Sequence, residues 1–317
     1  LGLTPAAGVA LVEAAYATAL GAIPNGAAKL QSISIGQAAA AAILALRRND
    51  SANAPFLDFS YVPGPNPGDF QFIPGYPPFA AATGWGDVTP FVLVSSAQYR
   101  PKRPYDLTSK KYAADFNEVK SLGGVTSTTR TAEQQEIALF WVEGSPQGWN
   151  RIARTVSAAR GIDLWSNARL FGLLNLASAD AYIADFENKY FFEFWRPVTA
   201  IPAADSDGNP DTPADTAWDS LLPSPPGPDH PSGHSGQGGA MSEVLARFFG
   251  DEATFSTTAT TLPGVTREFA SFSEAAQENA NSRIFIGFHF RHATIEGLKL
   301  GGKIGKVASN HYLGPAR

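Results

Sequence analysis

Three short segments in the C-terminal half combine the residue types that bind a tetrahedral oxyanion and react with it. They are Lys189–Pro197 (KYFFEFWRP), Pro231–His234 (PSGH) and Ser282–His289 (SRIFIGFH). Fixed positive charges bind oxyanions strongly, and Arg does so through a planar, bidentate fork. One imidazole can bind the central atom while another transfers protons near neutral pH. The three segments together therefore predict an anion site with imidazole chemistry.

In the first segment, Lys189 and Arg196 are seven residues apart, about two turns if the helix continues between them. Pro197 disfavours the helical conformation at Arg196, so we expect the helix to end there. Two cations at this spacing are usually a solvated stripe. Here three Phe and one Trp lie between them, which favours buried cations that need an anionic partner.

The second segment leads into a helix that we predict over 234–249, closed by Gly250. Free N–H groups at a helix start bind anions, Ser232 adds a hydroxyl, and Gly233 allows close approach of the backbone. An ordinary Ser N-cap is the structural alternative. A hydrolase nucleophile elbow is a weaker one, because Gln237 stands where that motif has Gly and no strand precedes it.

In the third segment, Ser282 and His289 would lie two turns apart on a helix predicted over 274–290. Arg283 follows Ser282, and Arg291 and His292 extend the polar cluster. A single His at such a place is more often a satisfied core residue. No P-loop, zinc pair or dinucleotide fingerprint is present, and the acidic stretch 205–215 does not fit an EF-hand loop.

The elements that must position these groups are predicted to be helices. No alternation typical of strands is found, and the long segments 50–107 and 202–228 are rich in Pro and Gly and expected to be irregular. A capping box at Thr131 and Gln134 predicts a helix that ends near Trp141. The sequence predicts an all-α fold, one helical-bundle domain over 1–317 with long Pro/Gly-rich loops and the oxyanion site within 186–293; further helices are expected at the Ala-rich N-terminus and over 26–47, 167–186 and 294–309.

Composition excludes several classes of protein. The net charge is −5 and only 17% of residues are charged, so no basic field would attract nucleic acid. The absence of Cys excludes disulfides, zinc thiolates and a Cys nucleophile. No apolar run predicts a membrane span. The chain starts without Met and without the basic start of a signal peptide. We expect a secreted or periplasmic protein whose upstream piece is removed. The sequence does not decide whether the protein forms a homo-oligomer.

The order KX6RP, PSGH, SRX5H resembles the three-part signature of the vanadium-dependent haloperoxidase and type 2 phosphatidic acid phosphatase superfamily. All defining positions match. The stretches RPVTAIPAADSDGNP and ENANSRIFIGFHFRHATIEG are similar to bacterial vanadium haloperoxidases in particular. The resemblance covers roughly residues 30–305 and is weaker toward the N-terminus.

The resemblance implies a role for each matching residue. His289 would bind vanadium directly, or act as the phosphorylated nucleophile in a phosphatase, and His234 would be the acid–base group. The vanadate cofactor, or phosphate or sulfate in its place, would be held by the five remaining residues of the signature: Lys189, Arg196, Ser232, Gly233 and Arg283.

The sequence departs from the family beside this site. Gly227 and His230 stand where homologues carry Phe and Tyr, and Ala293 stands where many carry an Asp that orients the metal-binding His. His289 is then expected to be oriented by a backbone carbonyl or another group. The candidate halide or substrate pocket consists of Phe186, Gly227, His230 and His292.

The resemblance favours a haloperoxidase that uses hydrogen peroxide and a peroxovanadate on His289 to oxidise a halide, bromide or iodide rather than chloride, for a small organic acceptor. A phosphomonoester or phospholipid phosphatase with His289 as nucleophile is the alternative. An anion-binding homologue with altered catalysis is the third reading.

Overall fold

The computed structural model describes residues 5–314. Contacts divide the chain into two compact units, residues 1–50 and 51–317. The expectation of one domain over the whole chain stays a prediction. Every residue of the predicted anion site lies in the second unit.

The first unit consists of α1 (Pro5–Gly21) and α2 (Ala27–Leu46), as expected from its Ala-rich sequence. None of the α2 residues is buried. By length and composition alone α2 could cross a membrane, with a mean hydropathy of 1.3 over its window, although the sequence predicted no span. Signal sequences and core helices of soluble proteins pass the same test, so this criterion alone assigns no membrane role.

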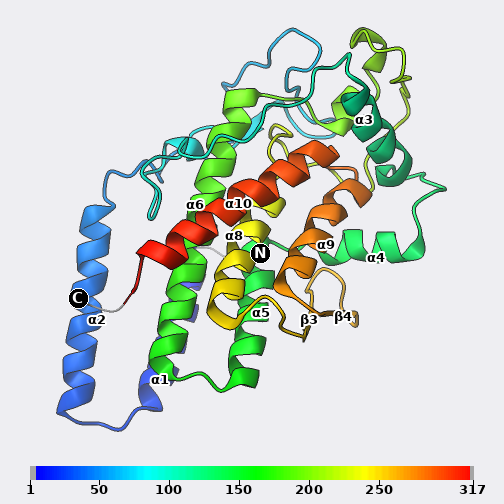
Figure 1. The fold of residues 1–317 in the computed structure, drawn as a ribbon. Helices are drawn as coiled ribbons and strands as arrows, with labels where there is room; N and C mark the ends of the chain where they lie inside the picture. Colours follow the sequence, from blue (N-terminus) through cyan, green and yellow to red (C-terminus); the bar gives the residue numbers. More distant parts are fainter. Residues whose placement is uncertain (1–4, 315–317) are drawn as a thin grey trace. The chain divides into compact units, whose positions relative to one another are not determined.

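The second unit is mainly helical, which confirms the predicted fold class (Figure 1). The loops 51–109 and 201–232 are largely irregular, as expected. The helices in chain order are α3 (Lys110–Gly123), α4 (Ala132–Phe140), α5 (Ser145–Arg160), α6 (Leu164–Phe192), α7 (Pro197–Ala200), α8 (Gly233–Phe249), α9 (Phe272–Phe285) and α10 (Arg291–His311), with short 3₁₀ turns η1 (Trp85–Asp87) and η2 (Ala204–Ser206).

Local sequence signals explain several of these helices. The capping box is present at the start of α4, where the Thr131 hydroxyl accepts from the Gln134 N–H at 3.1 Å. α6 extends beyond the predicted 167–186 at both ends. Leu170, Leu174 and Ala177 on one stripe of this helix are fully buried, whereas Phe171 beside them is only partly buried. The helix α5 was not predicted.

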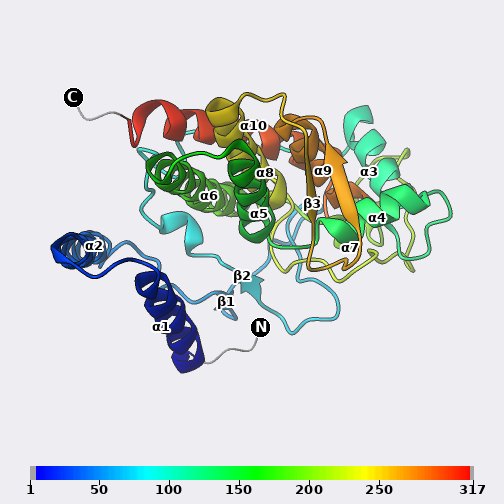
Figure 2. The same cartoon turned by 90° about the horizontal axis from the view of Figure 1, so that it is seen from below.

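Two short antiparallel ladders were also missed. One pairs β1 (Leu57–Asp58) with β2 (Ala80–Ala81), and the other pairs β3 (Phe255–Thr258) with β4 (Thr266–Phe269). The β3–β4 hairpin contacts α5 and α9 (Figure 2). These strands are too short to show a clear alternation of apolar and polar residues.

α8 lies at the centre of the unit and packs against α6, α9 and α10 (Figure 1). The contact with α10 is close because of Gly297 and Gly301: a Cβ at Gly301 would lie 2.0 Å from the Gly236 carbonyl oxygen. Helices whose backbones approach this closely need Gly at the contact. The start of α8, which carries PSGH, is therefore held against α10 by main-chain contact.

Candidate active site

The first segment of the site is not one continuous helix. α6 ends at Phe192, and Glu193 takes a left-handed conformation with φ 46°. Arg196 is extended, with φ −93° and ψ 159°, and precedes Pro197 as expected. The helix thus ends before the expected position at Arg196, and Lys189 and Arg196 do not share one helical face because the chain turns between them.

The third segment also differs from the prediction. α9 ends at Phe285 rather than continuing to residue 290, so Ser282 and His289 are not two helical turns apart. Gly287 has φ 83°, and a Cβ there would lie 2.5 Å from the Gly123 carbonyl oxygen. This left-handed Gly, packed against α3, stops the helix. His289 therefore lies in the turn between α9 and α10.

Despite these differences, the fold brings the three predicted cations together. Lys189, Arg196 and Arg283 are only 3%, 3% and 2% exposed. Arg196 lies close enough to lower the pKa of both other groups. Among the described residues, none of the three forms a salt bridge with a carboxylate. Apart from the contact of Arg196 with the His289 ring, their hydrogen bonds go to main-chain carbonyls. The Arg283 Nε is buried without a partner.

This concentration of positive charge is costly without an anion. Burial lowers the pKa of Lys189 to about 7, and the charge of Arg196 adds to that effect. Burial likewise lowers the pKa of Arg196 to about 10 and of Arg283 to about 9. A bound oxyanion would reverse these shifts, because an opposite charge favours the protonated forms.

His289 presents one ring nitrogen to the cations and the other to a carboxylate. Its Nε2 lies 3.3 Å from an Arg196 guanidinium nitrogen. Its Nδ1 lies 2.9 Å from Asp229 Oδ1, which also accepts from the Phe290 N–H. Because this oxygen is an acceptor, Nδ1 carries the proton and Nε2 keeps a lone pair. Burial, and then Arg196, lower the pKa of His289 well below its ordinary value, so the ring is neutral.

Asp229 therefore supplies the orienting group that the sequence left open for His289. It lies five residues before His234, in the loop that leads to α8. Burial raises its pKa to about 7, opposed by Arg196 and Lys189. Its proximity to PSGH is visible in the sequence. Nothing in the local pattern indicates that it reaches a ring sixty residues away.

The start of α8 favours the anion-binding interpretation over an ordinary cap. Ser232 is the N-cap residue, yet its side chain makes no capping bond. Its hydroxyl accepts from the Ser235 hydroxyl at 3.0 Å instead. Gly233 follows as the first helical residue, where N–H groups have no partner within the helix. Hydroxyl and N–H groups are thus available at a helix N-terminus.

His234 is the second imidazole and is partly exposed, unlike His289. Its Nε2 lies 3.2 Å from the Glu143 carbonyl oxygen and donates to it. Desolvation, and then the charge of Arg283, lower the pKa of His234 well below its ordinary value. His234 is therefore a neutral base whose Nδ1 carries the lone pair.

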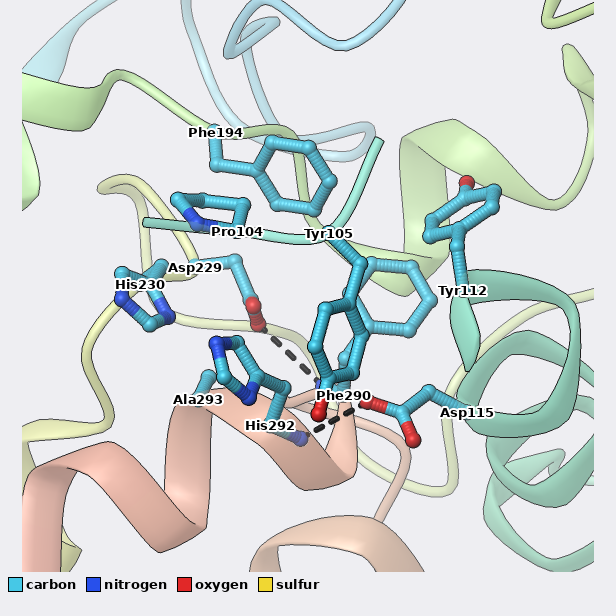
Figure 3. A pocket seen from close by; sticks show the side chains of 10 residues that line it. All are labelled: Pro104, Tyr105, Tyr112, Asp115, Phe194, Asp229, His230, Phe290, His292 and Ala293. Atoms are coloured by element: carbon cyan, nitrogen blue, oxygen red, sulfur yellow. Dashed lines mark hydrogen bonds between the residues drawn. The ribbon is translucent and has the colours of Figure 1, made fainter. Parts of the chain in front are cut away.

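The candidate halide residues are not all in one place. Phe186 packs against Tyr182 and Tyr190 on α6, and the Gly227 carbonyl accepts from Arg196 Nε. His230 and His292 line a separate small pocket together with Asp229 (Figure 3). Asp229 contacts Nδ1 of His289, so this pocket lies on the Nδ1 side of the ring, whereas Nε2 faces Arg196. The role of these four residues in halide chemistry stays a prediction.

Three polar residues near the site have partners outside it. Arg291, which the sequence grouped with His289 and His292, pairs with Glu118 at 2.6 Å. The His230 and His292 Nε2 atoms contact the carbonyls of Lys102 and Arg103 at 2.8 and 3.0 Å.

The donor set suits an oxyanion rather than a bare metal ion. Within residues 5–314, no three His, Asp or Glu side chains gather as metal ligands. The site instead offers three buried cations, one unpartnered buried guanidinium N–H and one imidazole lone pair. These groups would suit vanadate, which His289 Nε2 and the three cations would hold.

Removing the Asp229 carboxylate is expected to weaken anion binding. In Asp229→Ala, His289 loses the bond that fixes its ring and tautomer, and vanadate affinity should fall roughly 10- to 100-fold. Calorimetric titration with vanadate measures the loss. Adding Ala293→Asp to that variant should restore part of the affinity. Asp115→Ala is the control, because Asp115 accepts from the His292 N–H and not from His289. Equal affinity of Asp229→Ala and native protein would contradict this role.

Stabilisation by phosphate is expected to decrease as pH rises above about 7. Lys189 has a pKa of about 7, so it is charged below that pH and must regain a proton to bind an anion above it. Phosphate itself becomes more negative with pH, which would have the opposite effect. The measurement is the shift in melting temperature on adding phosphate, between about pH 6 and pH 9. Lys189→Met should flatten the decrease, and an increase with pH in native protein would contradict the prediction.

Comparisons with known proteins identify several similar proteins. Residues 169–315 match the family model described as the VCPO second helical-bundle domain. The chain is 30% identical over 237 residues to vanadium chloroperoxidase from Curvularia inaequalis, covering 54% of this chain and 38% of that protein. A solved bacterial vanadium-dependent iodoperoxidase is 31% identical, with a TM-score of 0.67, over 78% of this chain and 62% of that one.

A holo bacterial vanadium-dependent chloroperoxidase shares the fold, with a TM-score of 0.71 at 19% identity over 87% of this chain and 71% of that one. The chain thus spans less than two thirds of the first two relatives. These findings confirm the resemblance found in the sequence.

Proposed function

Because the chain is related to the vanadium haloperoxidases, we propose that it is a vanadate-dependent haloperoxidase. The observation that carries the proposal is the cluster of three buried cations, none in a salt bridge with a carboxylate, beside the unprotonated Nε2 of His289, which Arg196 contacts at 3.3 Å. Its co-substrates would be hydrogen peroxide, a halide and a small organic acceptor. When bound, vanadate would activate hydrogen peroxide for oxidation of the halide.

Residues of the chain would hold the cofactor, neutralise its charge and transfer protons. His289 Nε2 would hold the vanadium, with the ring fixed by Asp229. The side chains of Lys189, Arg196 and Arg283 would neutralise charge on the oxygens. The neutral His234 would take a proton from hydrogen peroxide at Nδ1 and return it to the leaving oxygen, from the partly exposed side of the site.

A phosphatase is the second candidate, because the Asp229–His289 pair would equally activate an imidazole nucleophile. The test measures bromide-dependent bromination before and after vanadate addition, beside phosphate-ester hydrolysis on the same sample. The proposal expects vanadate-dependent bromination. Ester hydrolysis that vanadate inhibits, without bromination, would replace the proposal by the phosphatase.

Halide choice is expected to depend on Gly227. A Cβ there would lie 3.6 Å from the Tyr190 hydroxyl and 3.8 Å from the Ala81 carbonyl, in ordinary contact. We expect activity with bromide or iodide and little with chloride, because the site lacks the aromatic wall. Gly227→Phe should change the chloride-to-bromide rate ratio, and Gly227→Ala, which adds no ring, is the control. Strong chlorination by native protein that Gly227→Phe leaves unchanged would rule out this role.

A further inference from the structure

The turn between α4 and α5 contacts the candidate site through two main-chain carbonyl groups. The Glu143 carbonyl oxygen accepts from His234 Nε2 at 3.2 Å. The Trp141 carbonyl oxygen accepts from Arg283 Nη1 at 3.0 Å. Among the described residues, the Glu143 carbonyl is the only hydrogen-bond partner of the His234 ring. The position of this turn therefore decides how the imidazole proposed to transfer protons is held.

The side chain of Glu143 is held by Arg151 on α5. The two groups form a bidentate ion pair, with N–O distances of 2.6 and 2.7 Å. Burial raises the pKa of Glu143, but hydrogen bonds from Arg151 and Thr260 outweigh this effect and hold it below its ordinary value. The carboxylate therefore stays charged near neutral pH. A bidentate pair of Arg and carboxylate fixes geometry in addition to its energy.

The β3–β4 hairpin adds three hydrogen bonds to this ion pair. Glu143 Oε1 accepts from the Thr260 hydroxyl at 2.6 Å and from its N–H at 3.2 Å. Arg151 also donates to the Thr258 carbonyl oxygen at 2.6 Å, where α5 contacts β3 (Figure 2). Exposed ion pairs usually contribute little, but the Glu143 side chain is only 8% exposed. The pair thus restrains the turn that carries the Glu143 carbonyl.

The neighbouring contact with Arg283 has a separate support. Trp141 is buried, and its Nε1 donates to Glu278 at 2.9 Å. Loss of Arg151 should therefore move the Glu143 carbonyl more than the Trp141 carbonyl. We expect the effect to reach His234 rather than the three cations.

We propose that Arg151 is a positioning residue for His234. Through Glu143, it fixes the carbonyl group that holds the Nε2–H of the ring, and so keeps the ring in one orientation with Nδ1 free to accept a proton. The inference rests on the proton-transfer role of His234 in the proposed function and deepens it. Within residues 5–314, the hydrogen bonds of Arg151 go to Glu143 and Thr258 and to no group that would hold the anion.

The test follows the Nε2–H proton of His234 by NMR in the full chain labelled with ¹⁵N-histidine, without vanadate or substrate. This proton should exchange slowly with water in native protein, and its resonance is identified by its absence in His234→Ala. Arg151→Met removes the ion pair and should raise the exchange rate about fivefold to tenfold, as expected for one lost hydrogen bond. Arg151→Lys, which keeps the charge without the fork, should give an intermediate rate.

Turnover and anion binding are measured on the same variants. Arg151→Met should lower kcat for bromination about tenfold, because a misplaced base transfers protons poorly. Its phosphate affinity by calorimetry should stay close to the native value. Glu143→Gln breaks the same pair from the other side and serves if Arg151→Met does not fold. Arg247→Met is the matched control, since it breaks the Arg247–Glu243 pair on α8, the helix that carries His234, and should change none of these values.

Three outcomes would overturn the inference. One is the absence of a protected Nε2–H resonance in native protein. Another is an unchanged exchange rate with a lower melting temperature in both pair variants, as expected for a merely structural pair. The third is a phosphate affinity that falls as much as kcat, which would assign the effect to the cations. The exchange rate is independent of turnover. Faster exchange in Arg151→Met without bromination by native protein would count against the haloperoxidase alone, and normal bromination with unchanged exchange would count against the role of Arg151 alone.

Discussion

His289→Ala is expected to abolish vanadate binding and bromination together. The substitution removes the only protein atom proposed to bond the metal, the Nε2 that lies 3.3 Å from Arg196. The three buried cations remain, so phosphate, which needs no bond to Nε2, should still bind. Vanadate and phosphate affinities by calorimetry, with the bromination rate, measure the two effects separately.

The variant also leaves the Asp229 carboxyl group without its imidazole partner, which lowers stability by a few kcal/mol. Melting curves therefore accompany the titrations, and His289→Asn, which keeps a polar group beside Asp229, is a second variant. His311→Ala is the matched control, since His311 is exposed at the end of α10. Retained vanadate binding with bromination in both His289 variants would mean that another group holds the metal.

His234→Ala is expected to keep vanadate but to lose about 10²- to 10⁴-fold in turnover, the usual effect of removing a general acid–base group. The ring is partly exposed and hydrogen-bonded to the Glu143 carbonyl, so its loss should disturb packing little. Desolvation and Arg283 hold the pKa of His234 well below its ordinary value. The neutral base therefore persists in mildly acid solution, and native activity should not fall through the ordinary His pKa near 6.5.

The measurements are the vanadate dissociation constant and kcat as a function of pH, for native protein, His234→Ala and His311→Ala. A His234→Ala variant as active as the native protein would show that proton transfer occurs elsewhere. Loss of vanadate together with activity would instead assign His234 to anion binding.

Many residues of the candidate site could be predicted because the chemistry of a side chain follows from its residue type. Lys189, Arg196 and Arg283 are cations in apolar surroundings, and charged groups in such surroundings need an anion wherever the fold places them. Short-range signals were equally readable. The capping box at Thr131 and the break before Pro197 depend only on residues within a few positions.

Predictions from the sequence were less accurate where segments that are far apart in the chain pack against each other. α9 was extended to residue 290 because its residues continue an apolar pattern, but Gly287 contacts Gly123 of α3 and stops the helix. The pairing of His230 with His292 in a pocket on the Nδ1 side of His289 likewise depends on the path of the loop that carries residues 102–105.

By itself, the sequence predicted which groups could bind an oxyanion, and that helices border them, because residue type and local periodicity act over one or two turns. Only the tertiary structure decided how those groups are oriented and completed. Asp229 reaches His289, and Asp185 fills the space beside Gly236, through packing between segments far apart in the chain. Such contacts depend on close main-chain approach, as at Gly301 of α10. The distance between two backbone segments cannot be inferred from a local sequence pattern.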